Sequence, residues 1–267
     1  MRELNIQELR QVQLEILDVV AKFCDDNQIQ YWLDAGTLLG AIRHKGYIPW
    51  DDDIDVGMLR PDYDRFMKLF NAQNTRYKFH CPETDPEFKR PFGKVCDTHT
   101  FLYEDANEGR VDLAVNIDIF PYDNAPDDDN LVNRMYIKRD YYYRRYFTRA
   151  KPLMTPFKGS VIKKIFVYAF RIALKLLPKN YFLHKIIENS KSYASQNTKR
   201  VGNFTGLSKI ACDKRVFDSF IDVEFEGRKY KAMAGYDEWL RAFYGDYMQL
   251  PPVEERVTPH TLHAFKD

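Results

Sequence analysis

The sequence predicts an α+β fold, a small mixed β-sheet flanked by helices, with a basic helical insertion. Apolar residues recur at helical spacing near both ends of the chain, and short alternating segments typical of strands fill residues 77–120. Between residues 134 and 179 there are thirteen Lys or Arg and one acid, Asp140, although the net charge is only +1. We therefore expect a catalytic core at 1–133, a basic aromatic helical segment at 134–187, and a C-terminal part at 188–267 that completes the catalytic domain.

The composition limits the classes of protein to which this chain can belong. The 267 residues are 45% apolar and 30% charged, as in an ordinary globular protein. No run approaches the roughly 18 uncharged apolar residues that span a bilayer, and the start at Met1 carries no secretory leader, so a cytoplasmic location is predicted. The cysteines lie far apart, which predicts reduced packing thiols and leaves a zinc site built from distant residues as the alternative. They are Cys24, Cys81, Cys96 and Cys212.

The first half of the predicted domain begins with a helix at 5–27, where apolar residues recur at helical spacing. A short strand at 29–33, a tight turn at Gly36 and a helix at 37–44 follow. "DIDVGM" alternates, so it predicts a strand that places Ile54, Val56 and Met58 on one face. Pro61 stands where helices tolerate it best and predicts a helix that continues through 62–71.

Four β-like pieces follow between residues 77 and 120: "YKFHCP", "FGKVCD", "TFLYED" and "DLAVNIDIF". The last is the best strand, with Ile117 and Ile119 on one face and Asn116 and Asp118 on the other. The acids at 127–129 predict a turn that starts a helix, and residues 161–178 a helix that Pro178 stops. Residues 223–233 predict a hairpin, and 235–252 a helix, a glycine turn and an extended exit.

The segment "YIPWDDDIDVGM" crowds four aspartates before an apolar strand. Strand geometry places Asp53 and Asp55 side by side on one face, with roughly 7 Å between their Cα atoms, close enough for one divalent cation to bridge them. Hard oxygen ligands without nearby cysteine suit Mg²⁺ or Mn²⁺. The alternative is a solvated acidic turn before a strand.

Two further features favour the metal interpretation. A strand that runs into Gly36 and Thr37 at the start of a helix presents free N–H groups to a phosphate. Asp118 in "NIDIF" adds a third acid on another strand. Phosphoryl transfer needs both charge neutralisation and positioning, and these parts together supply them.

Three stretches, "WLDAGTLLGAIRHKGYIPWDDDIDVGM", "VNIDIFPYD" and "GYDEWLRAFYGDYMQLPP", resemble the LicD family, to which fukutin and fukutin-related protein are also similar. The resemblance runs from about residue 7 to residue 263 and is loose at 134–179. It implies the nucleotidyltransferase fold. The family's turn falls on Gly36 and Thr37, its acidic pair on Asp53 and Asp55, and its third acid on Asp118.

The resemblance also implies an activity, the transfer of phosphocholine from CDP-choline to a sugar hydroxyl of teichoic acid or another cell-surface glycan precursor, with release of CMP. Our hypothesis is that Asp53 and Asp55 hold the metal on the pyrophosphate, while Asp118 shares a metal or takes the hydroxyl proton. Ala35 stands where many relatives carry glycine. Candidate contacts to the nucleotide or phosphate are Gly36, Thr37, Arg43, His44 and Lys94.

The choline group calls for aromatic faces, which hold quaternary ammonium ions. Aromatic residues that flank the motifs are candidates for choline or acceptor binding, each with a core-packing alternative. They are Tyr47, Trp50, Tyr103, Tyr122, Tyr244 and Tyr247. Three rival functions stay open. They are transfer of another phospho-group, such as phosphoribitol or a sugar phosphate, a catalytically inactive glycan-binding protein, and true nucleotidyl transfer that releases phosphate or pyrophosphate.

The basic segment has two interpretations. Lys164, Arg171 and Lys175 fall on one face of the helix predicted at 161–178, opposite a broad apolar face. Such a helix can lie in the headgroup layer of an anionic membrane, which would place the protein peripherally at the inner face of the plasma membrane, beside a lipid-linked glycan. The alternative is a core helix with a solvated basic stripe. No recognisable RNA or DNA module is present, so nucleic acid is not an expected partner.

Overall fold

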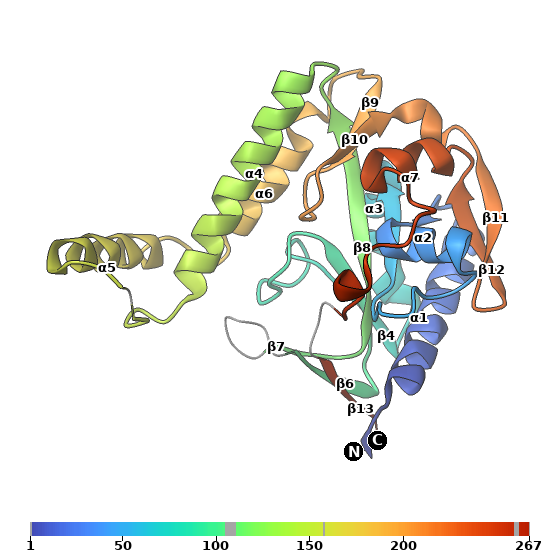
Figure 1. The fold of residues 1–267 in the computed structure, drawn as a ribbon, viewed down its shortest axis with the longest axis horizontal. Helices are drawn as coiled ribbons and strands as arrows, with labels where there is room; N and C mark the ends of the chain where they lie inside the picture. The colour runs from blue at the N-terminus through green and yellow to red at the C-terminus, as the bar shows by residue number, and fades with distance from the viewer. Residues whose placement is uncertain (1, 105–110, 157, 259–261, 267) are drawn as a thin grey trace.

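The computed structural model describes residues 2–104, 111–156, 158–258 and 262–266. Its main sheet is built around one long strand, β8, which runs through the centre of the molecule (Figure 1). Neighbouring strands follow the order β10-β9-β8-β3-β2, and β5 joins β8 to β4. The strands are β2 (Trp32–Leu33), β3 (Asp55–Leu59), β4 (Tyr77–His80), β5 (Gly93–Asp97), β8 (Asn116–Ala125), β9 (Arg200–Asn203) and β10 (Ile210–Asp213).

The predicted mixed sheet is confirmed, since β8 pairs in parallel with β3 and antiparallel with both β5 and β9. The first half of β8 pairs with β5 and its last three residues pair with β9. The C-terminal part of the chain therefore extends the sheet that the N-terminal part begins. The boundaries at 134 and 187 stay a prediction.

The segment "DLAVNIDIF" was expected to be one strand, and that prediction is wrong. β7 (Val111–Leu113) pairs with β6 (Thr100–Glu104) in a second sheet, while β8 starts at Asn116. The break falls where Thr100 Oγ1 accepts a hydrogen bond from the Val115 backbone N–H, at 2.9 Å. The second sheet also contains β13 (Leu262–Lys266) and β1 (Arg2–Glu3), and the two termini lie together beside it (Figure 1).

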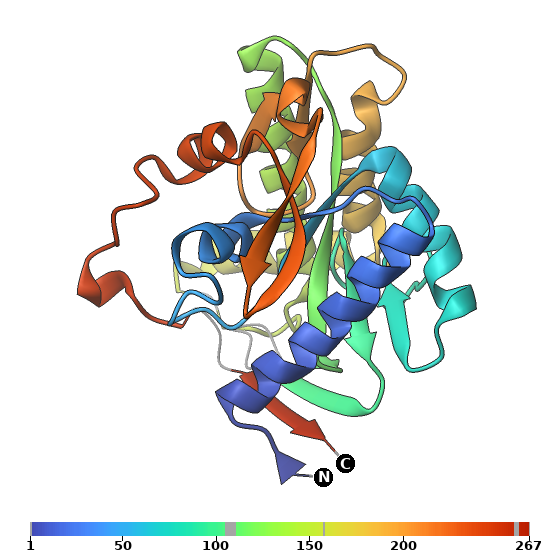
Figure 2. The ribbon, with the colours of Figure 1, turned by 90° about the vertical axis from the view of Figure 1, so that its right-hand side faces the viewer.

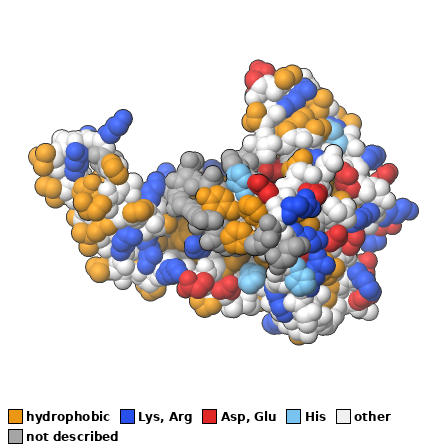
Figure 3. All heavy atoms as spheres, turned by 90° about the horizontal axis from the view of Figure 1, so that it is seen from below, with side chains coloured by type: hydrophobic (Ala, Val, Ile, Leu, Met, Phe, Trp, Pro, Cys, Tyr) orange, Lys and Arg blue, Asp and Glu red, His pale blue; other side chains and the backbone are white. Residues whose placement is uncertain are grey.

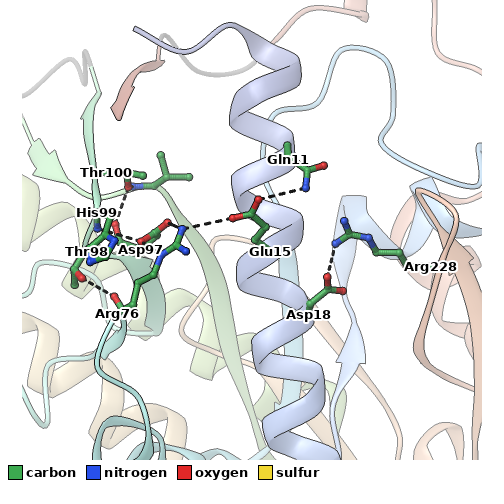
Figure 4. A network of polar contacts seen from close by, with 10 residues as sticks. Gln11, Glu15, Asp18, Arg76, Asp97, Thr98, His99, Thr100 and Arg228 are labelled. Atoms are coloured by element: carbon green, nitrogen blue, oxygen red, sulfur yellow. Dashed lines mark hydrogen bonds and ion pairs between the residues drawn. The ribbon is translucent and has the colours of Figure 1, made fainter. Parts of the chain in front are cut away.

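Helices cover the main sheet where the apolar periodicity predicts them. α1 (Ile6–Asp26) crosses one face of the sheet (Figure 2), and Phe23 on it contacts Phe66 and Phe70 of α3 (Arg60–Gln73). α2 (Ala35–Arg43) follows β2. A charged network also connects α1 to its neighbours: the half-buried Arg76 donates to both oxygens of the buried Asp97 and, at 3.5 Å, to Glu15 of α1 (Figure 4). The largest hydrophobic core thus lies under α1 and α3, and two smaller clusters lie beside α4 (Asp129–Ala150) and α6 (Tyr181–Ser190).

The basic segment forms three helices, α4 (Asp129–Ala150), α5 (Val161–Lys175) and α6 (Tyr181–Ser190). α4 and α6 lie side by side, and α4 packs on Ala125 at the end of β8, whereas α5 projects away from the body (Figure 1). Arg171 of α5 is buried, and Ile165 and Phe166 are 63% and 71% exposed. The expectation of a core helix with a solvated basic stripe is thus wrong, because the apolar side of the helix faces solvent.

The hairpin, the helix and the glycine turn predicted for residues 223–252 are confirmed. β11 (Phe220–Phe225) and β12 (Arg228–Met233) form the hairpin, and Glu226 and Gly227 have the positive φ angles of 51° and 71° that a tight hairpin turn requires. α7 (Tyr236–Tyr244) ends at Gly245, whose φ is 67°.

All four cysteines are buried free thiols. In the described part of the chain, no helix has the length and apolarity needed to cross a membrane.

Candidate active site

The parallel pairing of β3 with β8 brings the predicted acids together. Asp55 is the direct cross-strand partner of Asp118, so their Cα atoms lie about 4.8 Å apart, the usual spacing of neighbouring strands. Behind them Ile54, Val56 and Met58 are fully buried. The predicted alternation is therefore confirmed, and the acidic side of β3 faces away from the core.

A cavity of about 310 Å³ opens on this acidic side. It combines carboxylates, two cations and aromatic rings in one enclosure. The lining residues that bear these groups include Asp53, Asp55, Asp118, Arg90, Lys94, Phe92, Phe120, Tyr143 and Phe147. Acids, cations and aromatic surface in one cavity suit a charged ligand with an apolar part.

The electrostatics of the acids are unfavourable without a counter-charge. Burial raises the pKa of Asp55 well above its ordinary value, and the neighbouring carboxylates Asp53 and Asp118 raise it further. Ionised Asp55 therefore costs folding free energy at neutral pH. Groups held in such a state are typical of functional sites, where a ligand supplies the missing charge.

Lys94 provides part of the counter-charge. Its Nζ donates to Asp118 Oδ1 and, at 2.9 Å, to Asn116 Oδ1. The three residues meet because Lys94 on β5 is the cross-strand partner of Asp118 on β8. This places Lys94, a predicted phosphate contact, on the cavity wall beside the acids.

The chemistry of the donor set fits a hard divalent cation, since Asp53 and Asp55 present carboxylate oxygens to one cavity. Their mutual repulsion is the second observation in favour of that fit. Among the residues described, however, no three His, Cys, Asp or Glu side chains stand close enough to hold a metal as a ready-made set. Asp53 and Asp55 are thus the candidate metal ligands, whereas Asp118 forms an ion pair with Lys94.

Thr37 of the neighbouring helix α2 supports the acidic strand through a hydrogen bond. Its Oγ1 accepts a 2.8 Å hydrogen bond from the Asp55 backbone N–H, and the side chain is buried. The resemblance implies serine or threonine at this position, and the hydroxyl is what both share. A Cβ on Gly36 would lie 2.6 Å from Asp51 Oδ2, so the glycine leaves room for that carboxylate. The prediction of a tight turn at Gly36 before the helix is wrong, because α2 already begins at Ala35; the first turn of this helix positions the acidic segment.

Replacing Thr37 by valine should test that role. Thr37→Val keeps the shape but removes the acceptor, leaving the Asp55 N–H unpaired at a cost of about 1–3 kcal/mol in unfolding free energy. Thr37→Ser keeps the acceptor and should lose less than half of that. Urea denaturation measures both, and equal losses would show that the hydroxyl does not support β3.

The start of α2 also explains Ala35. Its φ is 43°, in the left-handed region that favours glycine, which is the residue many relatives carry there. Just before it, burial raises the pKa of Asp34 to about 6, while the Tyr122 hydroxyl donates to both of its oxygens, at 3.0 and 2.9 Å. Tyr122 is 1% exposed, so it braces the turn and does not enter our proposed choline site.

Several predicted contacts lie around a second cavity of about 640 Å³ instead of the acidic one. Arg43 lines it and donates to the Tyr247 carbonyl oxygen at 2.7 Å. Gly36 and Asp51 lie on its wall as well, so the α2 turn separates the two cavities. The predicted residues of this second cavity are Gly36, Arg43, Trp50, Tyr244 and Tyr247.

Besides Thr37 and Tyr122, three further predicted residues line neither cavity. Tyr47 is 7% exposed, and its hydroxyl donates to Gln13 Oε1 at 3.0 Å. Tyr103 lies on β6 with its ring 6.0 Å from that of His263. The ring of His44 lies 6.4 Å from that of Trp50, and burial lowers the pKa of the His44 imidazole. These three stay outside the site that we propose.

Sequence reasoning missed the aromatic wall of the acidic cavity. Phe92 and Phe120 lie with ring centroids 4.5 Å apart, and Tyr143 and Phe147 stack at 5.8 Å. The strand alternation could have found Phe120, since it shares the face of Asp118. Tyr143 and Phe147 come from α4, and only the packing of that helix against the sheet brings them there.

The comparisons with known proteins agree with these features. The family model described as "LicD/FKTN/FKRP, nucleotidyltransferase domain" matches residues 28–164. The chain belongs to the LicD family. That stretch contains β3, β8 and the acidic cavity's carboxylates, so the family signature and the site coincide.

Named relatives of this LicD family member transfer two different groups. It is 33% identical to "Lipopolysaccharide cholinephosphotransferase LicD" of Haemophilus influenzae over 99% of both chains. It is 33% identical to "Ribitol 5-phosphate transferase FKRP" of Mus musculus over 35% of this chain and 17% of that protein. It is 30% identical to "Ribitol-5-phosphate transferase FKTN" of Mus musculus over 37% of this chain and 19% of that protein.

Proposed function

We propose that this LicD family member is a metal-dependent phosphocholine transferase that moves phosphocholine from CDP-choline to a sugar hydroxyl of a cell-surface glycan precursor and releases CMP. One observation carries the proposal: the carboxylates of Asp53, Asp55 and Asp118 share a cavity with an aromatic wall. Similarity over 99% of both chains to the Haemophilus influenzae cholinephosphotransferase supports the choice of cargo.

The acidic cavity's residues divide the chemistry among them. Mg²⁺ or Mn²⁺ held by Asp53 and Asp55 would supply the counter-charge for the pyrophosphate. Lys94 and Arg90 stand on the same wall as N–H donors for phosphate oxygens. The sugar oxygen bonds to the choline-bearing phosphorus, the bond from that phosphorus to the CMP oxygen breaks, and Asp118 takes the hydroxyl proton. CMP leaves with the electron pair of the broken bond.

The aromatic wall suits the choline group. The rings of Phe92, Phe120, Tyr143 and Phe147 line the cavity that holds the acids, and quaternary ammonium ions bind to aromatic faces. A polyol such as ribitol would gain little from these rings. We assign the second cavity, with Arg43 and Trp50, to the nucleotide or acceptor.

Phe147→Ala tests the cargo assignment. Loss of one ring face should raise KM for CDP-choline about tenfold, since a desolvated cation–π contact contributes roughly 1–2 kcal/mol. Tyr141→Ala is the matched control, because Tyr141 lies on the same helix, is 44% exposed and does not line the cavity. CMP release is measured with CDP-choline and with CDP-ribitol. Faster release from CDP-ribitol in the wild-type protein would assign the ribitol phosphate cargo of the FKRP and FKTN relatives instead.

A further inference from the structure

Helix α5 exposes a complete apolar face on a segment that projects from the body of the protein (Figure 1). On a helical wheel the face spans about half of the circumference, and no charged residue falls within it. Six of its side chains have exposed fractions between 49% and 82%. They are Val161, Ile162, Ile165, Phe166, Ile172 and Leu176.

The opposite side of α5 attaches the helix to the rest of the chain. Arg171 is 6% exposed and donates to the carbonyl oxygens of Thr155 and Leu153, at 2.5 and 3.3 Å. Lys175 Nζ donates to the Arg149 carbonyl oxygen at 3.1 Å, and Leu174 is buried. Hydrogen bonds from basic residues thus hold the helix in an orientation that turns its apolar face outward.

An apolar face of this size needs a partner, because proteins that stay monomeric in water rarely expose a large contiguous apolar surface. The charge of the segment indicates which partner. Thirteen Lys or Arg and one acid lie between residues 134 and 179. Lys158, Lys163 and Lys164 are exposed near the start of the helix. Figure 3 shows the projecting segment with orange apolar and blue basic side chains together.

We propose that α5 docks the protein onto an anionic lipid bilayer, with its apolar face inserted at the level of the headgroups. Helices that lie in a membrane interface combine an apolar face bearing Phe and Leu with lysines at its edges, where they meet anionic headgroups. A protein partner would need a strongly acidic surface around an apolar groove, whereas a bilayer supplies both features everywhere.

Docking would orient the acidic cavity relative to the bilayer. α4 carries Tyr143 and Phe147 of the cavity wall, and residues 151–160 connect it directly to α5. The proposal does not depend on the proposed function, since an α5 that binds lipid would do so whichever group the cavity transfers.

Co-sedimentation with vesicles tests the proposal. Full-length protein should bind vesicles of phosphatidylcholine mixed with phosphatidylglycerol, and bind less to phosphatidylcholine alone or at high salt. Ile165→Asp/Phe166→Asp should weaken that binding by at least about tenfold, because it places two carboxylates in the inserted face. Val253→Asp is the matched control, since Val253 is 72% exposed on the body of the protein. The control should bind as the wild type does.

A second variant and a second readout keep the outcomes distinct. Lys163→Glu/Lys164→Glu should weaken binding to the anionic vesicles while leaving the apolar face intact. Both α5 variants should melt at the wild-type temperature and release CMP from CDP-choline as the wild type does. Absence of vesicle binding at low salt, or equal binding by Ile165→Asp/Phe166→Asp, would overturn the proposal. If the wild-type protein does not bind vesicles but dimerises with rising concentration, and Ile165→Asp/Phe166→Asp abolishes that dimer, the apolar face binds a second copy of the chain instead.

Discussion

Asp55→Asn is expected to lower phosphocholine transfer by about a thousandfold or more while it stabilises the fold. The loss follows because the variant removes a carboxylate that we assign to the metal and the pyrophosphate. The gain in stability follows because an amide carries no charge at this position. In the wild type, burial and the carboxylates of Asp53 and Asp118 raise the pKa of Asp55. We expect the melting temperature to rise by roughly 2–4 °C at pH 7, which corresponds to about 1 kcal/mol.

The pH dependence of that gain has a definite sign. A carboxyl whose pKa is raised on folding favours the folded state while it is protonated, and this contribution is lost as pH rises through the folded pKa. The difference in stability between Asp55→Asn and wild type should therefore be small near pH 4 and grow toward neutral pH. Mg²⁺ should raise the melting temperature of the wild type and have less effect on the variant.

The control for Asp55→Asn is Asp222→Asn. Asp222 lies on β11, and its carboxylate accepts a 2.7 Å hydrogen bond from Lys231, far from the cavity wall. Transfer by this variant should equal that of the wild type. If Asp55→Asn both retains turnover and loses stability, then Asp55 is a structural strand residue and our assignment is wrong.

Arg60→Met should produce the largest loss of stability, about 3–5 kcal/mol in unfolding free energy. Arg60 Nε and Nη2 donate to the two carboxylate oxygens of Asp123, each at 2.7 Å. The Asp123 side chain is 1% exposed and also accepts from the Ser190 hydroxyl. Removing the guanidinium leaves a buried carboxylate without its cation, and α3, β8 and α6 all meet there.

Arg65→Met on the same helix is the matched control. Arg65 is 50% exposed: its contact with Asp62 is 3.6 Å, and it donates to the carbonyl oxygens of Asn27 and Gln28 at the surface, so its loss should change stability by at most about 1 kcal/mol. Arg60→Met/Asp123→Asn should recover part of the loss, because the second change removes the unpaired charge. Urea denaturation of the four proteins measures all of these values. Equal effects of Arg60→Met and Arg65→Met would show that the buried pair contributes little.

Local patterns predicted most of the helices and the alternation of β3, since apolar periodicity depends only on neighbouring residues. The family resemblance directed attention to Asp55 and Asp118, but the sequence could not show that they are direct cross-strand partners. That pairing depends on the register between β3 and β8, whose paired residues lie 63 positions apart. The split of "DLAVNIDIF" between two sheets likewise depends on a distant contact, the bond from Val115 to Thr100.

The aromatic residues show most clearly which features could not be predicted from the sequence. Position beside the motifs suggested Tyr122 and Tyr47, yet packing buries both in the core. The rings on the acidic cavity come from Phe92 just before β5, from Phe120 of β8 and from the distant helix α4, and no single local pattern connects all of them. The exposure of the apolar face of α5 was also beyond the sequence, because an amphipathic helix has the same periodicity whichever side faces the body.

We propose that Asp53, Asp55 and Asp118, together with a divalent cation, catalyse the transfer of phosphocholine from CDP-choline. The most direct measurement is CMP formation during incubation with CDP-choline and Mg²⁺, compared with EDTA and with Asp118→Asn. We predict CMP with Mg²⁺ in the wild-type protein and almost none in the other two reactions. CMP formation that persists in EDTA, or at the same rate in Asp118→Asn, would contradict the account.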